Sequence, residues 1–137
     1  MAKGPLSGVK VLEYCSFIAG PYCTKLLADL GAEVIKVEKP EGDVARKHGP
    51  FLHNEPNPEC SSVFLYNNTN KMGVTLNLES PTGREIFKKL AAQADILLED
   101  GAPGEMKRLG LDYEVLREIN PGLIMASITP FGQDGPY

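Results

Sequence analysis

The feature that most constrains the fold is a strand, a helix and a second strand in close succession within residues 8–38. Residues 8–14 and 33–38 are rich in β-branched and apolar side chains, as strands are. Residues 22–30 lie between them and end at Gly31, which is typical of a short helix with a glycine stop. Such a succession predicts a right-handed βαβ unit with parallel strands.

The periodicity of this unit assigns faces to its side chains. Alternation places Glu13 beside Val11 on one face of the first strand, and Lys36 beside Val34 on one face of the second. Pro21 is expected as the first residue of the helix, where its missing N–H is not needed. The residues expected on the buried side of the helix are Cys23, Leu26, Leu27 and Leu30.

The rest of the chain continues the alternation after a long interruption. Residues 39–66 show no period, hold several prolines, and are expected to run over the surface. The further elements expected are strands at 72–78, 94–99 and 123–128, a helix capped by Ser80 with Pro81 in its first turn, a short helix from Pro103 to Gly110, and a helix from Asp112 to Ile119. The fold class is therefore α/β: a Rossmann-like open parallel sheet with helices on both faces.

Charge and hydropathy exclude several classes of partner. Fourteen basic against eighteen acidic residues give a net charge of −4, so there is no basic excess for binding nucleic acid. The uncharged run at 14–24 is too short to span a bilayer, and residues 1–5 do not resemble a secretory signal. We expect neither nucleic acid nor membrane as a partner.

Cysteine and histidine usage argues against disulfides and metals. Three cysteines (Cys15, Cys23 and Cys60) are an odd number without CxxC spacing, and the only histidines are His48 and His53. No metal site is expected, and a reducing cytoplasm is the simplest compartment.

Known nucleotide and nucleophile motifs are absent around the first helix. Residues 16–22 contain only Gly20 where a dinucleotide fingerprint needs three glycines, and no P-loop or GxSxG elbow occurs. The helix start at Gly20-Pro21 follows a strand end, where anions bind in open α/β sheets. A plain strand–helix turn explains it equally well.

A colinear set of motifs gives a more specific indication. The segments are Gly4–Glu13, Ala19–Pro21, Leu27–Glu38, Asn70–Lys71, Thr75–Leu78, Gly83–Arg84, Ala94–Glu99, Pro103–Gly104, Arg108–Leu111, Asn120–Pro121 and Phe131–Tyr137. Together they resemble the beginning of class III coenzyme A transferases, a family that includes formyl-CoA and carnitine CoA-transferases and α-methylacyl-CoA racemases.

This resemblance implies that residues 1–137 are the N-terminal part of a large CoA-binding domain, in a longer chain that forms an interlocked homodimer. It implies CoA or acyl-CoA as substrate, a carboxylic acid as acceptor, and no permanently bound cofactor. The residues that it places along CoA are Ile18, Ala19, Lys39, Leu76, Asn77, Leu78, Glu79, Asp100, Gly101, Ala102 and Arg108. Lys39 would meet a phosphate, and residues 76–79 would line the adenosine.

Four positions depart from the family pattern. The family often has Lys where Glu79 stands, Asn and an aromatic residue at Asp100-Gly101, and Arg or Gly at Ala102. The two acids would add negative charge beside phosphates, so CoA binding is expected to be weak.

The resemblance also places the catalytic groups outside these residues. The transferase branch uses an Asp nucleophile, and the racemase branch a His–Asp pair, beyond the matched segment. We therefore predict a CoA-transferase segment that is inactive alone. A racemase of the same family and a non-catalytic CoA-binding or interaction module are the alternatives.

Overall fold

The computed structural model describes residues 4–135 and contains one five-stranded parallel sheet. The strands are β1 (Lys10–Tyr14), β2 (Glu33–Glu38), β3 (Met72–Thr75), β4 (Ile96–Glu99) and β5 (Ile124–Ser127). Their spatial order is β3-β2-β1-β4-β5, and all neighbouring pairs are parallel. The predicted α/β class is confirmed, although β3 stops three residues earlier than expected.

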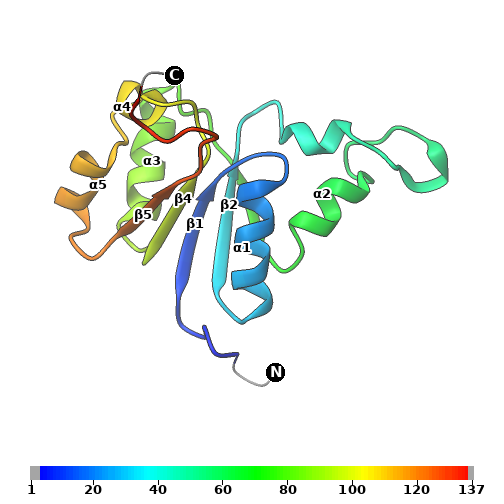
Figure 1. The fold of residues 1–137 in the computed structure, drawn as a ribbon, viewed down its shortest axis with the longest axis horizontal. Coiled ribbons are helices and arrows are strands. Elements are labelled where there is room, and N and C mark those ends of the chain that lie inside the picture. Colours follow the sequence, from blue (N-terminus) through cyan, green and yellow to red (C-terminus); the bar gives the residue numbers. More distant parts are fainter. Residues whose placement is uncertain (1–3, 136–137) are drawn as a thin grey trace.

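Helices cover both faces of the sheet (Figure 1). They are α1 (Ala19–Asp29), α2 (Ser62–Asn67), α3 (Pro81–Ala91), α4 (Glu105–Arg108) and α5 (Tyr113–Ile119), with two 3-10 turns at Val44–Lys47 and Leu52–Asn54. Helix α1 lies on one side of the sheet, and α3 and α5 lie on the other. None of the helices at 4–135 has the length and hydropathy needed to cross a bilayer.

Two apolar clusters result, one on each face. The larger joins the sheet to α3 and α5 through side chains such as Leu97, Phe87 and Leu116, which are fully buried. The smaller joins Val11 and Val34 of the sheet to α1. The fold is therefore held by burial on both faces, as parallel sheets generally are.

The start of α3 matches its sequence signals. Ser80 is the N-cap, its hydroxyl accepts a hydrogen bond from the Gly83 N–H at 3.0 Å, and Pro81 opens the helix. Phe87 and Ala91 are buried as expected, whereas Ile86 is 41% exposed. The inward stripe of α3 is thus narrower than predicted.

Helix α1 departs from prediction at its start and in its buried face. It begins at Ala19, so Pro21 is the third helical residue rather than the first; a proline is tolerated there because the first four N–H groups lack helical partners. Leu26 and Leu30 are 45% and 47% exposed, and Cys23 is also exposed. The residues that face the sheet are Gly20, Pro21, Thr24 and Ala28. Of the predicted stripe only Leu27 packs against the core of this face. The other three residues were predicted wrongly, because small residues let α1 lie close to the sheet and the larger ones remain outside.

The segment after β2 contains structure that its sequence did not reveal. Helix α2 has only six residues, too few for a period to be recognised. The Ser61 hydroxyl caps it by accepting from the Phe64 N–H at 3.2 Å.

We predict that Ser80→Ala lowers the free energy of unfolding by about 1 kcal/mol, because it removes the side-chain acceptor that caps α3. Chemical denaturation followed by circular dichroism measures this. Thr82→Ala, on the exposed side of the same first turn, is the control and should change stability less. An equal effect of both substitutions would contradict the capping role.

Candidate ligand-binding site at the carboxyl edge of the sheet

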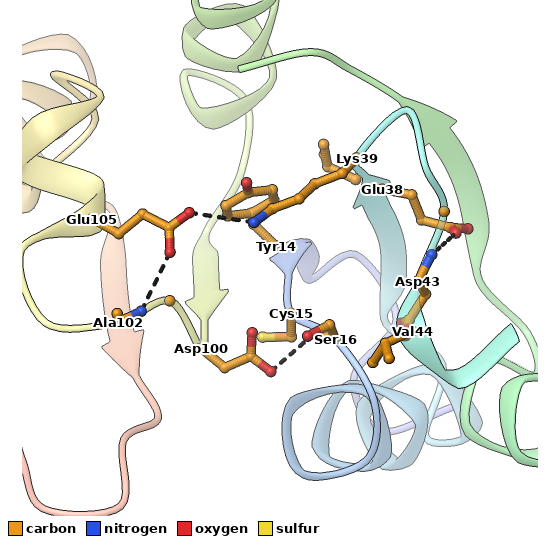
Figure 2. A pocket seen from close by; sticks show the side chains of 13 residues that line it. Tyr14, Cys15, Ser16, Glu38, Lys39, Asp43, Val44, Asp100, Ala102 and Glu105 are labelled. Carbon is orange, nitrogen blue, oxygen red and sulfur yellow. Dashed lines mark hydrogen bonds and ion pairs between the residues drawn. The ribbon is translucent and has the colours of Figure 1, made fainter. Parts of the chain in front are cut away.

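A cavity of about 340 Å³ opens where β1, β2 and β4 end. The chain passes from β1 to β2 on one side and later returns to β4 on the other, which makes this edge a topological switch point. Open α/β sheets bind ligands at such points. The side chains around the cavity come from all three strand ends and the loops that follow them, and include Tyr14, Ser16, Lys39, Asp43, Asp100 and Glu105 (Figure 2).

A buried ion pair lies beneath this cavity, on the α1 face of the sheet. Glu13 and Lys36 are directly opposite each other in the β1–β2 register, and the Lys36 Nζ lies 2.9 Å from the Glu13 Oε1. Both side chains are at most 2% exposed. Two charges removed from water in this way are stable only when fully paired and hydrogen-bonded.

Lys36 also bonds to the loops that form the cavity. Lys36 Nζ also lies 2.8 Å from Asp43 Oδ2 and donates to the Cys15 carbonyl oxygen at 2.8 Å. The other carboxylate oxygen of Asp43 accepts from the Phe17 and Ala45 N–H groups. Lys36 thus fixes the loop after β1 to the loop after β2.

On its other side, Glu13 holds a second lysine and α1. Its Oε2 lies 2.8 Å from Lys71 Nζ and accepts the Thr24 hydroxyl at 2.6 Å. Lys71 Nζ in turn donates to the Pro21 carbonyl oxygen at 2.7 Å. The N-terminal turns of α1 are therefore bound to the end of β1 through charged groups.

The pKa values in this network reflect competition between burial and pairing. Burial lowers the pKa of Lys36, but the charges of Glu13 and Asp43 outweigh it and the pKa is raised. At Lys71 burial outweighs the attraction of Glu13, and the pKa is lowered. Burial raises the pKa of Asp43, but the hydrogen bond from Lys36 outweighs it and the pKa is lowered.

Asp100 bonds the loop that leads from β1 into α1. Its Oδ2 accepts the Ser16 N–H at 2.9 Å (Figure 2). Burial, reinforced by the charges of Asp43 and Glu13, raises the pKa of Asp100 to about 6. Burial also raises the pKa of the neighbouring Cys15 thiol. The site thus holds a carboxyl group, Asp100, that takes up a proton near pH 6 rather than near pH 4.

Gly20 allows this close arrangement. A Cβ at this position would lie 2.4 Å from the Cys15 Sγ, much closer than real side chains approach. Only glycine lets the first turn of α1 lie this close to the end of β1. The close contact therefore explains why a glycine stands at the predicted Gly20-Pro21 turn.

The predicted site residues fall into four places. Lys39, Asp100, Gly101 and Ala102 line the cavity. Glu79 and Arg108 form a bidentate pair, with N–O distances of 2.6 and 2.9 Å. The remaining predicted residues are Ile18 and Ala19, exposed at the start of α1, and Leu76, Asn77 and Leu78, which precede α3.

Two of these placements limit what the side chains can do. Leu78 is 4% exposed and packs in the α3-side core, so only its backbone can face a ligand. Lys39 reaches from the end of β2 over the Tyr14 ring, with its Nζ 5.8 Å from the ring centroid and 3.4 Å from Glu105 Oε1. Lys39 therefore has an acid partner.

Sequence reasoning missed Tyr14, Asp43 and Glu105 as parts of the site. Tyr14 ends the predicted first strand, a position that marks the carboxyl edge and could have been recognised. Asp43 lies in the segment without a period, and Glu105 pairs with a lysine 66 residues away, so neither had a local signal.

We predict that Lys36→Met lowers the free energy of unfolding by about 3–5 kcal/mol, because it leaves Glu13 and Asp43 buried without their shared cation. Denaturant titration measures the change. Lys10→Met, at the exposed start of β1, is the matched control and should have little effect. A loss below 1 kcal/mol for Lys36→Met would contradict the role of this network.

A second prediction concerns pH. The folded Asp100 carboxyl keeps its proton up to a pH near 6, whereas the unfolded chain releases it near 4, so this group lowers stability as pH rises through that interval. Asp100→Asn keeps an acceptor for Ser16 and should stabilise the fold at pH 7.5 but not at pH 4. After allowance for solvent screening of a half-buried group, the expected difference is about 1 kcal/mol.

Thermal unfolding at the two pH values tests this expectation. Asp134→Asn, on an exposed segment outside the cavity, is the charge-matched control. The same stability change at both pH values in Asp100→Asn would refute the proton uptake.

Comparison with known proteins identifies the type of chain. Residues 6–137 match the family described as CoA-transferase family III. The chain is 46% identical to human succinyl-CoA:glutarate CoA-transferase over 96% of this chain and 30% of that enzyme. It is 46% identical to the succinyl-CoA:(R)-benzylsuccinate CoA-transferase subunit BbsE of Thauera aromatica over 85% of this chain and 28% of that subunit.

A solved structure agrees with this match. The crystal structure of Rv3272 from M. tuberculosis superposes with a TM-score of 0.90 at 42% identity, over 98% of this chain and 37% of that one. The chain thus spans about a third of the length of the relatives that it matches. The family match over nearly all of its residues shows that this chain belongs to CoA-transferase family III.

Proposed function

We propose that residues 1–137 are the N-terminal, CoA-binding part of an enzyme that moves CoA from an acyl-CoA thioester to a carboxylic acid. The observation that carries the proposal is the cavity at the switch point of the sheet, which Lys39 lines, in a chain of this family. A second cation, Arg108, lies at the end of α4 and is paired with Glu79. CoA is the substrate here and not a resident cofactor.

The chain's own residues bind and orient the ligand. Lys39 and Arg108 present donors that suit phosphate oxygens, and Arg108 can make two parallel bonds. Backbone at Ile18 and Ala19, at the start of α1, faces the ligand. Residues 76–79 and 100–102 complete the cleft as the family resemblance implies.

The covalent steps belong to a carboxylate outside these residues. That aspartate attacks the thioester carbonyl, and the C–S bond breaks. CoA leaves as a thiolate, and the acyl group remains on the aspartate as a mixed anhydride. The thiolate then attacks the aspartyl carbonyl, releasing the first acid and leaving an aspartyl-CoA thioester. The acceptor carboxylate attacks the aspartyl-CoA thioester and expels the CoA thiolate, which forms a second mixed anhydride. The thiolate then attacks the acyl carbon that came from the acceptor, so that the new acyl-CoA forms and the aspartate carboxylate is released. The 137 residues alone supply binding without this nucleophile.

The acids between which CoA moves are proposed to be dicarboxylic. The similar proteins include enzymes named for succinyl-CoA with glutarate, L-malate or (R)-benzylsuccinate. We further propose an interlocked homodimer in the cytoplasm, in which residues 1–137 belong to the large domain. An enzyme of the racemase branch would instead interconvert the epimers of an α-methylacyl-CoA. A non-catalytic CoA-binding or interaction module would neither transfer CoA to an acid nor racemise an α-methylacyl-CoA.

The first test is turnover. The full-length protein that contains this chain should exchange CoA between succinyl-CoA and dicarboxylic acids such as glutarate, whereas residues 1–137 alone should not exceed the buffer rate. Epimerisation of an α-methylacyl-CoA without acceptor would favour the racemase. Transfer by the isolated segment would refute the placement of the nucleophile.

The second test is CoA binding by calorimetry. Lys39→Ala and Arg108→Ala should each weaken binding by roughly tenfold, because each removes a charge-assisted bond to phosphate. Lys47→Ala and Lys107→Ala remove exposed lysines that do not line the cavity and serve as controls. Equal binding by all four variants would refute this phosphate site.

A further inference from the structure

Each cation proposed to bind phosphate already holds a carboxylate. Both terminal nitrogens of Arg108 donate to Glu79, at 2.9 and 2.6 Å, and Lys39 lies 3.4 Å from Glu105. The Arg108–Glu79 pair is the more complete of the two, because it engages both oxygens of the carboxylate. An arginine fork binds carboxylate and phosphate in the same planar, bidentate geometry.

Glu79 is held in place by its own backbone contacts. Its N–H donates to Asn77 Oδ1 at 3.0 Å, and its carbonyl oxygen accepts from Arg84 Nη1 at 2.9 Å. Arg84 Nη1 also donates to the Leu78 carbonyl oxygen at 3.1 Å. These bonds fix the turn before α3, so the Glu79 side chain starts from a defined position opposite Arg108.

The charge of Glu79 persists in this arrangement. The hydrogen bond from Arg108 lowers the pKa of the Glu79 carboxyl, so it is ionised at neutral pH. The two side chains are 56% and 67% exposed, which makes the pair accessible to a ligand arriving from solvent. A phosphate that binds the same Nη1–Nη2 edge of Arg108 must therefore displace both bonds to Glu79, and it lies beside the negative charge of that carboxylate.

We propose that Glu79 competes with a ligand phosphate for Arg108 and so sets the affinity of this chain for CoA. This inference rests on the proposed CoA site and adds a residue that opposes it. In the unliganded protein the carboxylate takes the place of the phosphate. When CoA binds, the Arg108 guanidinium transfers both bonds to phosphate oxygens, and Glu79 turns into solvent.

The test is calorimetric titration of CoA into wild type, Glu79→Gln and Glu79→Lys. Glu79→Gln should bind CoA about two- to fivefold more tightly, the range that an exposed ion pair supports, and Glu79→Lys more tightly still. Glu114→Gln is the matched control: it breaks a pair with Arg117 of similar exposure, on α5 and away from the cavity. It removes the same unit of charge and should leave CoA affinity at the wild-type value.

The outcomes separate this inference from the function on which it rests. Equal affinities of Glu79→Gln and Glu114→Gln would overturn the competition while CoA binding stands. A CoA-bound structure in which Arg108 keeps both bonds to Glu79 would do the same. Failure of wild type and all variants to bind CoA would overturn the proposed site itself, and the inference with it.

Discussion

The ion pair between Glu13 and Lys36 is the interaction on which the rest of the site depends. It joins two neighbouring strands near their carboxyl ends, on the face covered by α1, and it is almost completely removed from water. Around it, Lys71 and Asp43 bring the total to two cations and two anions, so the buried charge is balanced. Through these four groups the strand ends, the loops after them and the start of α1 share one set of bonds.

The surface above this network is organised differently. There the cations Lys39 and Arg108 also have acid partners, but in each of these pairs the cation is more than half exposed to solvent. A buried pair cannot lose one member without leaving the other uncompensated, whereas an exposed pair can exchange a partner for solvent or for a ligand. The rigid part and the exchangeable part of the site therefore use the same chemistry at different depths.

The sequence predicted those features that depend on local patterns. The strand at Glu33–Glu38 agrees to the residue, and the cap at Ser80 is where its spacing indicated. Alternation also placed Glu13 and Lys36 on faces shared with apolar residues, but their direct contact depends on strand register, which no local pattern specifies. Likewise Glu79 and Arg108 are 29 residues apart and meet only because the sheet brings two loops together. The prediction for the buried side of α1 was wrong for most of its residues, because hydrophobicity does not indicate how closely a helix can approach the sheet.

The difference in depth has a consequence for how the protein responds to dissolved salt. Mobile ions gather around exposed charges and screen their interactions, with a screening length of about 10 Å at 0.1 M, whereas the buried charges around Lys36 are screened much less. Ionic strength therefore acts on the outer pairs and spares the inner network. The occupancy of the cleft can follow the ionic composition of its surroundings while the scaffold that forms the cleft keeps its shape.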